Sequence, residues 1–182
     1  MASGLGGGSA DAAATLRLLA RRQGVALDNP RLFECADALG SDVPACLYSR
    51  TALGRGRGEA LDALPGAPGT PVLLVNPQVA VSTAQVFAAW DGVDRGPLPA
   101  GDVLTIARLG RNDLEQPALG IAPEIGAVLQ RLAAQPGTTI ARMSGSGATC
   151  FALFEDADTR TRAADAVRAA QPGWWCLETV LL

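Results

Sequence analysis

The sequence predicts a mixed α/β protein of the α+β, two-layer kind, whose second part is a ferredoxin-like sandwich. One observation is the glycine-rich start, which runs directly into an alanine-rich helix. Another is a linker at residues 65–71, rich in the proline and glycine that interrupt regular structure. A third is the order of predicted elements after this linker, β-α-α-β-β-α-β, which is typical of a split βαβ sandwich. We therefore expect two domains, over residues 1–65 and 66–182.

The first part is predicted to begin with two helices. Ser9 and Asn29 are residue types that favour helix N-caps. Pro30 suits a first turn, and Gly40 suits the end of a helix. An apolar run then favours a strand, and a glycine-rich run favours edge strands. The predicted elements are helices over 9–22 and 29–39, a strand over 43–48, and one or two edge strands within 51–64.

The second part is predicted from apolar strands and amphipathic helices. In one of these helices, Ile125, Val128 and Leu132 recur at helical spacing and form an apolar stripe. Pro123 suits the first turn of this helix, and Gly137 follows its end. The predicted elements are a strand over 72–75, a helix from 82 or 83 to 90, a loop over 92–101, a helix over 121–134, strands over 140–143 and 149–154, a helix over 158–170 and a strand over 175–181.

Composition and charge limit the classes of function. Of the 182 residues, 48% are hydrophobic, which is enough for a core, and the formal net charge is −3. This charge argues against a general nucleic-acid binder and a membrane-surface binder, which usually carry a basic patch. Every basic residue is Arg, which holds its proton too tightly to shuttle it. A general base must therefore be a carboxylate, a Cys or a Tyr.

The cysteines are scattered, without a CxxC pair or a neighbouring His, so a zinc site is not expected. We expect them to be buried free thiols in a reducing compartment. There is also no basic-then-apolar leader, and no apolar run near the roughly 20 residues that span a bilayer. These features favour a cytoplasmic protein. The four cysteines are Cys35, Cys46, Cys150 and Cys176.

A candidate phosphate-binding loop is formed by Gly4, Leu5, Gly6, Gly7, Gly8 and Ser9. Glycines let an anion approach the main chain, and the helix that follows offers unpaired N–H groups and the positive end of its dipole. The Ser9 hydroxyl can contact phosphate or Mg²⁺. The loop is not a Walker A sequence, which requires a Lys, and its glycine spacing does not fit a dinucleotide-binding fingerprint. A flexible linker is the alternative explanation.

Asp42 lies just past a predicted helix end, in front of an apolar run. Its carboxylate can accept or orient the proton of a substrate hydroxyl during phosphoryl transfer. Taken alone, an ordinary turn explains an Asp at this position better. Thr83 and Phe87 are four residues apart on one predicted helix face. They are either a cap and a core aromatic, or a hydroxyl contact and an aromatic wall for a ligand ring.

A second loop of small residues lies between two predicted strands and consists of Ser144, Gly145, Ser146 and Gly147. It can form a plain hairpin turn. It can also form a second nest of main-chain N–H groups that binds an anion. The occurrence of two such loops in one small chain favours the binding explanation. The segment 112–115, by contrast, is expected to be only the capped start of a helix.

Two segments resemble conserved motifs of the GHMP small-molecule kinases. Residues 4–13 (GLGGGSADAA) resemble the second motif of that family, and residues 142–148 (RMSGSGA) resemble the third. Residues 40–44, 56–59 and 112–115 resemble the branch that phosphorylates a cytidine diphosphate derivative of methylerythritol. The motifs follow the order of the family across essentially the whole chain, and the set is specific although no single motif is.

The resemblance implies a kinase that uses ATP and Mg²⁺ to phosphorylate a hydroxyl of this substrate in non-mevalonate isoprenoid biosynthesis. It implies that the first loop holds the ATP phosphates, with Ser9 near Mg²⁺, and that Asp42 acts on the accepting hydroxyl. Thr83 and Phe87 would lie on the substrate side, Phe87 near the cytosine, with the 144–147 loop beside the site. The implied fold is part of a ribosomal-protein-like domain followed by a ferredoxin-like domain.

The sequence also departs from the family pattern. The opening strands, with a first motif whose Lys pairs with the catalytic Asp, are absent, so we expect an N-terminally truncated chain that needs this part for activity. Ala10 stands where the family usually has a second hydroxyl residue. The alternatives are an inactive fragment or another GHMP kinase, for homoserine, mevalonate or a sugar. We expect no nucleic-acid or membrane partner, and a monomer or weak homodimer.

Overall fold

The computed structural model describes residues 4–182, which form two compact units. The helical unit is Gly6–Gly66. The sandwich unit combines residues 4 and 5 with Ala67–Leu182. The chain therefore passes from one unit to the other twice, after Leu5 and after Gly66. Each unit has a hydrophobic core of its own.

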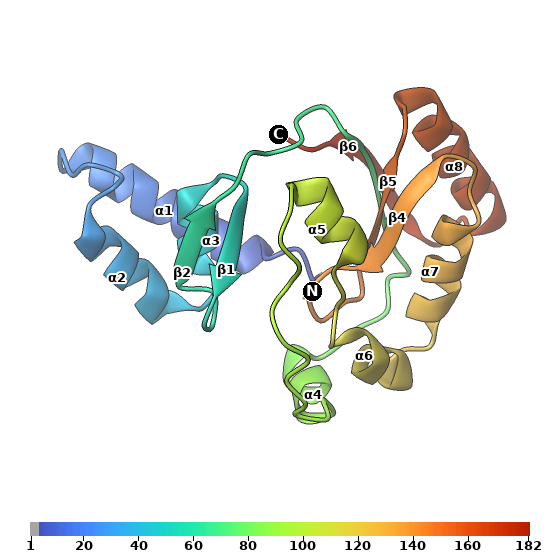
Figure 1. Cartoon of the computed structure of the whole chain (residues 1–182), viewed down its shortest axis with the longest axis horizontal. Coiled ribbons are helices and arrows are strands. Elements are labelled where there is room, and N and C mark those ends of the chain that lie inside the picture. Colours follow the sequence, from blue (N-terminus) through green and yellow to red (C-terminus); the bar gives the residue numbers. More distant parts are fainter. Residues whose placement is uncertain (1–3) are drawn as a thin grey trace. The chain divides into compact units, whose positions relative to one another are not determined.

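The helical unit is built from three helices and a hairpin (Figure 1). Asn29 caps the second helix as predicted, because its Oδ1 accepts a hydrogen bond from the Arg31 N–H at 3.0 Å. The two strands pair antiparallel, as expected for edge strands in this segment. The elements are α1 (Gly7–Arg22), α2 (Pro30–Leu39), α3 (Val43–Tyr48), β1 (Ala52–Arg55) and β2 (Ala60–Ala63). The core that joins the helices contains Ala13, Ala36, Val43 and Leu47.

The segment predicted as a strand over 43–48 is the short helix α3, so this prediction is wrong. Pro44 lies in the first turn of α3, where a missing N–H leaves no hydrogen bond unmade. Val43 and Leu47 are four residues apart and both buried, so one face of the helix packs on the core. A run this short cannot display helical spacing over more than one turn, and its apolar character alone does not distinguish a helix from a strand.

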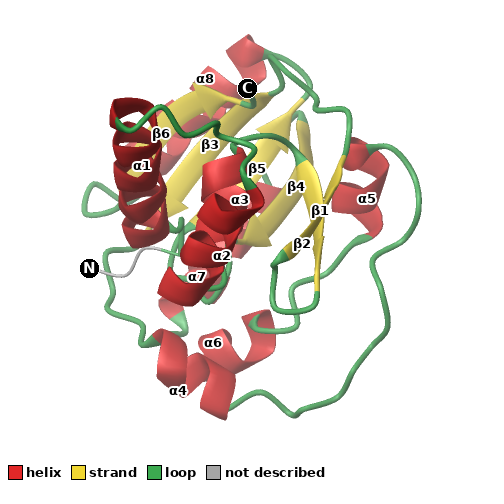
Figure 2. Cartoon of the chain, turned by 90° about the vertical axis from the view of Figure 1, so that its left-hand side faces the viewer, coloured by secondary structure: helices red, strands yellow, loops and turns green. Residues whose placement is uncertain are grey.

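The sandwich unit is an antiparallel sheet with helices on both faces. Its strands lie side by side in the order β4-β5-β3-β6, as Figure 2 shows. The first strand therefore lies between the third and the last, which is the topology expected for a split βαβ sandwich. The elements are β3 (Pro71–Asn76), α4 (Thr83–Ala88), α5 (Val103–Leu109), α6 (Glu115–Ile121), α7 (Glu124–Ala133), β4 (Thr138–Met143), β5 (Cys150–Phe154), α8 (Ala157–Ala170) and β6 (Trp175–Val180).

Alternation along the strands divides the core of this unit between the two faces of the sheet. Leu73 and Val75 of β3 pack in the main core with residues of α7 and α8. Val72 and Leu74 point to the opposite face, which α5 partly covers. Figure 1 shows α5 on one side of β4 and β5, with α7 and α8 on the other. No helix in residues 4–182 is both long enough and apolar enough to cross a lipid bilayer.

Two helices of the sandwich unit differ from the prediction. The helix predicted over 121–134 begins only at Glu124, after Pro123. The residue before a proline is disfavoured in helical conformation, and Ala122 accordingly lies at φ −135° and ψ 85°. The helix α5 was not predicted at all. Its signal is Asp102, whose side chain accepts hydrogen bonds from the N–H groups of Leu104 and Thr105, both at 3.0 Å.

The cysteines are free, as expected, but the prediction that all are buried is wrong. Cys150 is buried, Cys35 is exposed, and the remaining two are partly buried. Burial, followed by the negative charge of Glu115, raises the pKa of the Cys150 thiol to about 12. In residues 4–182 there is no group of three or more His, Cys, Asp or Glu that could hold a metal ion.

A pair of matched leucine substitutions tests the core assignment. Leu132 of α7 is fully buried in the main core, whereas 67% of Leu109 of α5 is exposed. We expect Leu132→Ala to lower the free energy of unfolding by about 2–5 kcal/mol, because it removes buried apolar surface and leaves a cavity. Leu109→Ala should change it by less than about 0.5 kcal/mol. Urea unfolding monitored by circular dichroism measures both values, and similar losses would contradict the assignment.

Thiol reactivity tests the burial of Cys150. The raised pKa leaves almost no thiolate at pH 8, and burial blocks access, so Cys150 should resist alkylation by iodoacetamide in the native protein. The exposed Cys35 should be alkylated readily under the same conditions. Peptide mapping by mass spectrometry after a timed reaction distinguishes the two sites. Modification of Cys150 at the rate of Cys35 would show that its surroundings open in the native state.

Candidate functional site

At the start of α1, no side chain in residues 4–182 covers the main-chain N–H donors. Gly6 precedes the helix at φ 64°, a conformation that favours glycine, and provides no side-chain cap. A Cβ at Gly7 or Gly8 would meet no atom within 4 Å. The Ala10 N–H bonds to the Gly6 carbonyl at 2.8 Å. The N–H groups of Gly7, Gly8 and Ser9 have no hydrogen-bond partner among residues 4–182. They can therefore bind an anion at the positive end of the helix dipole.

Ser9 does not cap α1, contrary to the prediction. It lies inside the first turn of the helix, and Gly6 occupies the cap position. The glycine in left-handed conformation lets the helix begin two residues earlier than the serine suggested. Within the described chain, the Ser9 hydroxyl makes no hydrogen bond. It is therefore available to a phosphate oxygen or to a hard cation such as Mg²⁺.

Asp42 lies at the N-terminus of α3 with its side chain exposed and without a capping hydrogen bond. Gly58 of the hairpin lies close to Ser41, just before Asp42: a Cβ at Gly58 would lie only 3.0 Å from the Ser41 carbonyl oxygen. Burial and then the Asp42 carboxylate raise the pKa of the Cys46 thiol, whereas Arg17 lowers it. Asp42 is thus a solvent-accessible carboxylate that can accept a proton or a hydrogen bond from a ligand hydroxyl.

The helix α3, which begins after Asp42, packs on α1. Val43 belongs to the same small core as Ala13, in the first half of α1. Arg17, one turn further along α1, donates hydrogen bonds to the carbonyls of Cys46 (2.7 Å) and Leu47 (3.3 Å) near the end of α3. These contacts join α3 to α1 within the helical unit, which contains both Asp42 and residues 6–9 of the predicted phosphate loop.

In the sandwich unit, residues 144–147 form a tight turn, which we call the 144–147 turn. The Gly147 N–H donates to the Ser144 carbonyl, and the Ser144 N–H donates to the Thr149 carbonyl, both at 2.9 Å. Gly145 lies at φ 54°. The N–H groups of Gly145 and Ser146 have no hydrogen-bond partner in the described part of the chain. Two adjacent free donors of this kind can bind an anion.

Contacts from outside the turn hold it in place. The Ser144 hydroxyl donates to the Gly4 carbonyl at 2.7 Å. Gly4 lies at φ 71°, and a Cβ there would lie 2.6 Å from the Ser144 oxygen and 2.7 Å from the Gly147 oxygen. From α4, the Thr83 hydroxyl meets the Ser146 hydroxyl at 2.9 Å. From the start of α6, the Asn112 amide reaches the carbonyls of Met143 and Gly145.

The structure brings some of the predicted sandwich-unit residues together and leaves others apart. Thr83 is in direct contact with the 144–147 turn. Phe87 lies one turn further along α4, with 56% of its side chain exposed. It is therefore not a core aromatic, which was the alternative explanation. Leu5 is also exposed, at 42%.

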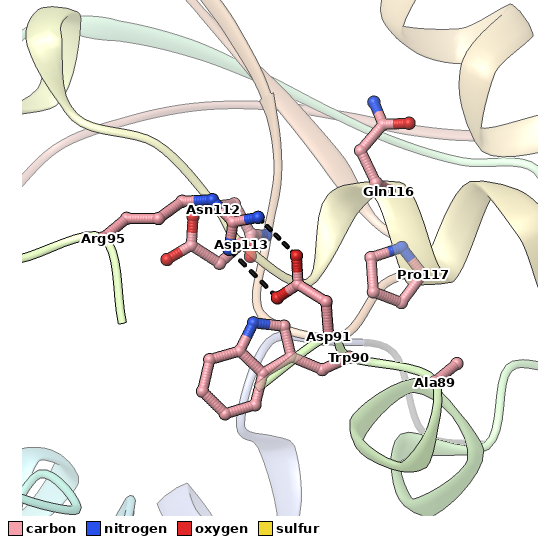
Figure 3. Close-up of a pocket in the computed structure, with 8 residues that line it drawn as sticks. All are labelled: Ala89, Trp90, Asp91, Arg95, Asn112, Asp113, Gln116 and Pro117. Carbon is pink, nitrogen blue, oxygen red and sulfur yellow. Dashed lines mark hydrogen bonds and ion pairs between the residues drawn. The ribbon is translucent and has the colours of Figure 1, made fainter. Parts of the chain in front are cut away.

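A cavity of about 370 Å³ lies between the end of α4 and the start of α6 (Figure 3). On one side, Arg95 pairs with Asp91 at 2.5 Å, and this hydrogen bond from Arg95 is the main reason for the lowered pKa of Asp91. On the other side, Asp113 pairs with Arg111 at 2.9 Å. The lining residues are Ala89, Trp90, Asp91, Arg95, Asn112, Asp113, Gln116 and Pro117. Asn112 links this cavity to the turn.

The sequence does not predict the contacts that two residues make in this arrangement. Asn112 is predicted at a helix start and within a motif of the resemblance, and it does accept a hydrogen bond from the Leu114 N–H. Its contacts with the turn lie 31 and 33 residues along the chain and leave no local signal. Gly4 was assigned to phosphate binding, whereas its carbonyl is bound by Ser144. The positive φ of Gly4 is typical of glycine. Its contact with Ser144, however, could not be identified from local sequence.

Comparison with protein families gives matches at both ends of the chain. The description "GHMP kinases N terminal domain" matches residues 1–50, and "GHMP kinases C terminal" matches residues 97–173. A 4-diphosphocytidyl-2-C-methyl-D-erythritol kinase of Rhizorhabdus wittichii is 56% identical over 100% of this chain and 62% of its own length. The enzyme of the same name from Novosphingobium aromaticivorans is 51% identical over 97% of this chain and 60% of its own. The chain thus spans less than two thirds of these relatives.

Solved structures are similar in fold. A crystal structure of 4-(cytidine 5'-diphospho)-2C-methyl-D-erythritol kinase matches with a TM-score of 0.78 and 36% identity, over 98% of this chain and 66% of the other. A homoserine kinase from Cytophaga hutchinsonii matches with a TM-score of 0.79, over 100% of this chain and 67% of the other. Its identity is 20%, so it shows a shared fold alone.

Two glycine substitutions test the close approach at Gly4. Gly4 and Gly6 both have positive φ, at 71° and 64°, but only Gly4 lies against other main-chain atoms. We expect Gly6→Ala to cost about 1–2 kcal/mol of conformational strain. Gly4→Ala should cost more, because two carbonyl oxygens must also move. Thermal unfolding of the two variants measures the difference, and equal shifts in melting temperature would contradict the close packing.

Proposed function

Because the chain belongs to the GHMP kinase family, we propose that it takes part in ATP-dependent phosphorylation of a hydroxyl of 4-diphosphocytidyl-2-C-methyl-D-erythritol, a step of isoprenoid biosynthesis. The observation that carries the choice of substrate is the identity of 50% or more, across nearly the whole chain, to relatives named for this compound. The open N-terminus of α1 supports the choice of phosphoryl transfer. The proposal concerns the whole enzyme, of which this chain matches the larger part.

The nucleotide is proposed to bind at the glycine-rich stretch. The N–H groups of Gly7, Gly8 and Ser9 would bind ATP phosphates, because they are hydrogen-bond donors at a helix N-terminus and have no partner among residues 4–182. Gly6 supports this by starting the helix without a side chain. Residues 4 and 5 belong to the same stretch in sequence. Gly4 would contribute through the backbone position that its contact with Ser144 fixes.

The Ser9 hydroxyl fits a role beside Mg²⁺. It is an oxygen donor without a hydrogen-bond partner in residues 4–182, and Mg²⁺ prefers oxygen ligands. Because no acidic cluster for a metal occurs in that range, we propose that the ion is shared between Ser9 and phosphate oxygens. When bound, Mg²⁺ neutralises negative charge on the transferring phosphoryl group.

Asp42 is proposed to act on the accepting hydroxyl. The chain contains neither Lys nor His, and its arginines stay protonated, so the candidates for a base within it are a carboxylate, a Cys or a Tyr. Asp42 is exposed, carries no capping bond, and lies at the start of α3, a helix that packs on α1 within the helical unit. Most of the rate enhancement would come from positioning and from charge neutralisation, as is usual in phosphoryl transfer.

The sandwich unit is proposed to bind the alcohol substrate. The free N–H groups of Gly145 and Ser146 suit a phosphate oxygen of its diphosphate. Ser144 and Gly147 close the turn that presents them. Thr83 stabilises the turn, and the exposed ring of Phe87 offers a surface on which cytosine can stack.

Phosphoryl transfer from radiolabelled ATP tests the proposal. The chain, with Mg²⁺, is given 4-diphosphocytidyl-2-C-methyl-D-erythritol, homoserine, mevalonate or a sugar, and the products are separated. We expect label in the cytidine compound alone. Label in another alcohol would replace this proposal with that kinase activity. No transfer to any of them would support an inactive chain, and the same assay with a chain extended to the length of the relatives then tests the family reaction.

Asp42→Asn tests the assignment of the base. We expect kcat to fall by about two to four orders of magnitude, because the amide cannot accept the proton. The melting temperature should stay within about 1 °C of the original, since the exposed side chain makes no capping bond. Asp28→Asn, at an exposed position between α1 and α2, serves as the matched control and should leave kcat unchanged. A kcat for Asp42→Asn close to that of the control would contradict the role of Asp42.

A further inference from the structure

The side chain of Asn112 makes three hydrogen bonds, and each goes to the main chain. Its Nδ2 donates to the Met143 carbonyl at 3.0 Å and to the Gly145 carbonyl at 2.8 Å. Its Oδ1 accepts from the Leu114 N–H at 3.0 Å. The amide hydrogens thus bond to the carbonyls of the residues before and after Ser144. The amide oxygen bonds to the Leu114 N–H at the start of α6. The side chain ties the 144–147 turn to α6.

The bond to Gly145 has a directional effect because a peptide group is planar. The Gly145 carbonyl and the Ser146 N–H belong to the same peptide group and, in the trans form, point in opposite directions. When Asn112 holds the carbonyl, the Ser146 N–H is aimed away from α6. This N–H has no partner among residues 4–182, so nothing in that range holds it from its own side. Its direction therefore depends on the contact at the carbonyl.

We propose that Asn112 is a positioning residue for anion binding by the 144–147 turn. This inference rests on the proposed function, in which the turn binds a phosphate group of the substrate. Without the Asn112 amide, the peptide group between Gly145 and Ser146 can rotate, and the Ser146 N–H loses its fixed direction. The neighbouring Asp113, which Figure 3 shows beside Asn112, has a different role. Its carboxylate is engaged by Arg111 at 2.9 Å.

Asn112→Asp separates this role from the role of Asn112 at the start of α6. The introduced carboxylate keeps an oxygen for the Leu114 N–H, so the helix start is preserved. It loses both donors, and it places a negative oxygen against the carbonyls of Met143 and Gly145. The matched control is Asn29→Asp. Asn29 makes the same kind of bond, to the Arg31 N–H at 3.0 Å, and its Nδ2 donates to no group in residues 4–182.

Two measurements by NMR on the labelled protein read the outcome. The first is amide hydrogen exchange of the 144–147 turn, which needs no ligand. The second is a titration with inorganic pyrophosphate, followed through the Gly145 and Ser146 amide signals. For Asn112→Asp we expect faster exchange in the turn, and pyrophosphate binding weaker by about tenfold or more. The melting temperature should fall by several degrees with the loss of two hydrogen bonds, while the variant stays folded at the temperature of the titration. Asn29→Asp should behave like the original in both measurements.

The pH dependence provides a second readout of the donors lost in Asn112→Asp. As the pH falls, the introduced carboxyl takes up a proton and can donate it to one of the two carbonyls. The difference in pyrophosphate affinity between Asn112→Asp and the original protein should therefore shrink toward low pH. Unchanged exchange and affinity in Asn112→Asp would overturn the inference. Absence of pyrophosphate shifts at the turn of the original protein would instead contradict the proposed role of the turn, whatever the variant does.

Discussion

Gly4 lies so close to the 144–147 turn that no side chain fits at its position. A Cβ there would lie 2.6 and 2.7 Å from two carbonyl oxygens of the turn, and the Ser144 hydroxyl binds the Gly4 carbonyl at 2.7 Å. This contact fixes one side of the turn. Thr83 fixes another side through Ser146, and Asn112 fixes the carbonyl side. The turn is therefore held by contacts that leave the N–H groups of Gly145 and Ser146 free.

In the helical unit, main-chain N–H donors are also left free, but other residues are responsible. Its donors at the start of α1 are free because the residues there are glycines and no acidic side chain occupies the first turn. The carboxylate of Asp42 lies at the start of α3, and packing holds this helix, since Val43 is buried in the core and Arg17 binds the carbonyls near the end of α3. In both units, small residues expose main-chain donors, and neighbouring side chains set their positions.

Much of the fold could be predicted from local sequence, because local patterns determine it. Alternating and continuous apolar runs located the strands of the sandwich, and Asn29 located the start of α2. The errors arose where another residue decided the outcome. Pro44 allowed a helix where an apolar run suggested a strand, and Gly6 began α1 ahead of Ser9. Pro123 delayed the start of α7.

In the candidate site, too, some features could be predicted from local sequence and others could not. The glycine-rich stretch, Asp42 and the 144–147 turn have recognisable sequence patterns, and their chemistry could be proposed from the residue types alone. The contacts that hold the turn could not, because they join residues distant in sequence: 140 positions separate Ser144 from Gly4, and 33 separate Asn112 from Gly145. Such partners become visible only when the chain is folded.

The claim on which the account depends most is that the start of α1 binds the phosphates of ATP through its free N–H groups. A titration of the ¹⁵N-labelled chain with Mg–ATP tests it most directly. We predict saturable shifts of the amide signals of Gly7, Gly8 and Ser9, with smaller changes toward the end of α1. Saturable binding that shifts signals elsewhere and leaves these three unchanged would contradict the claim.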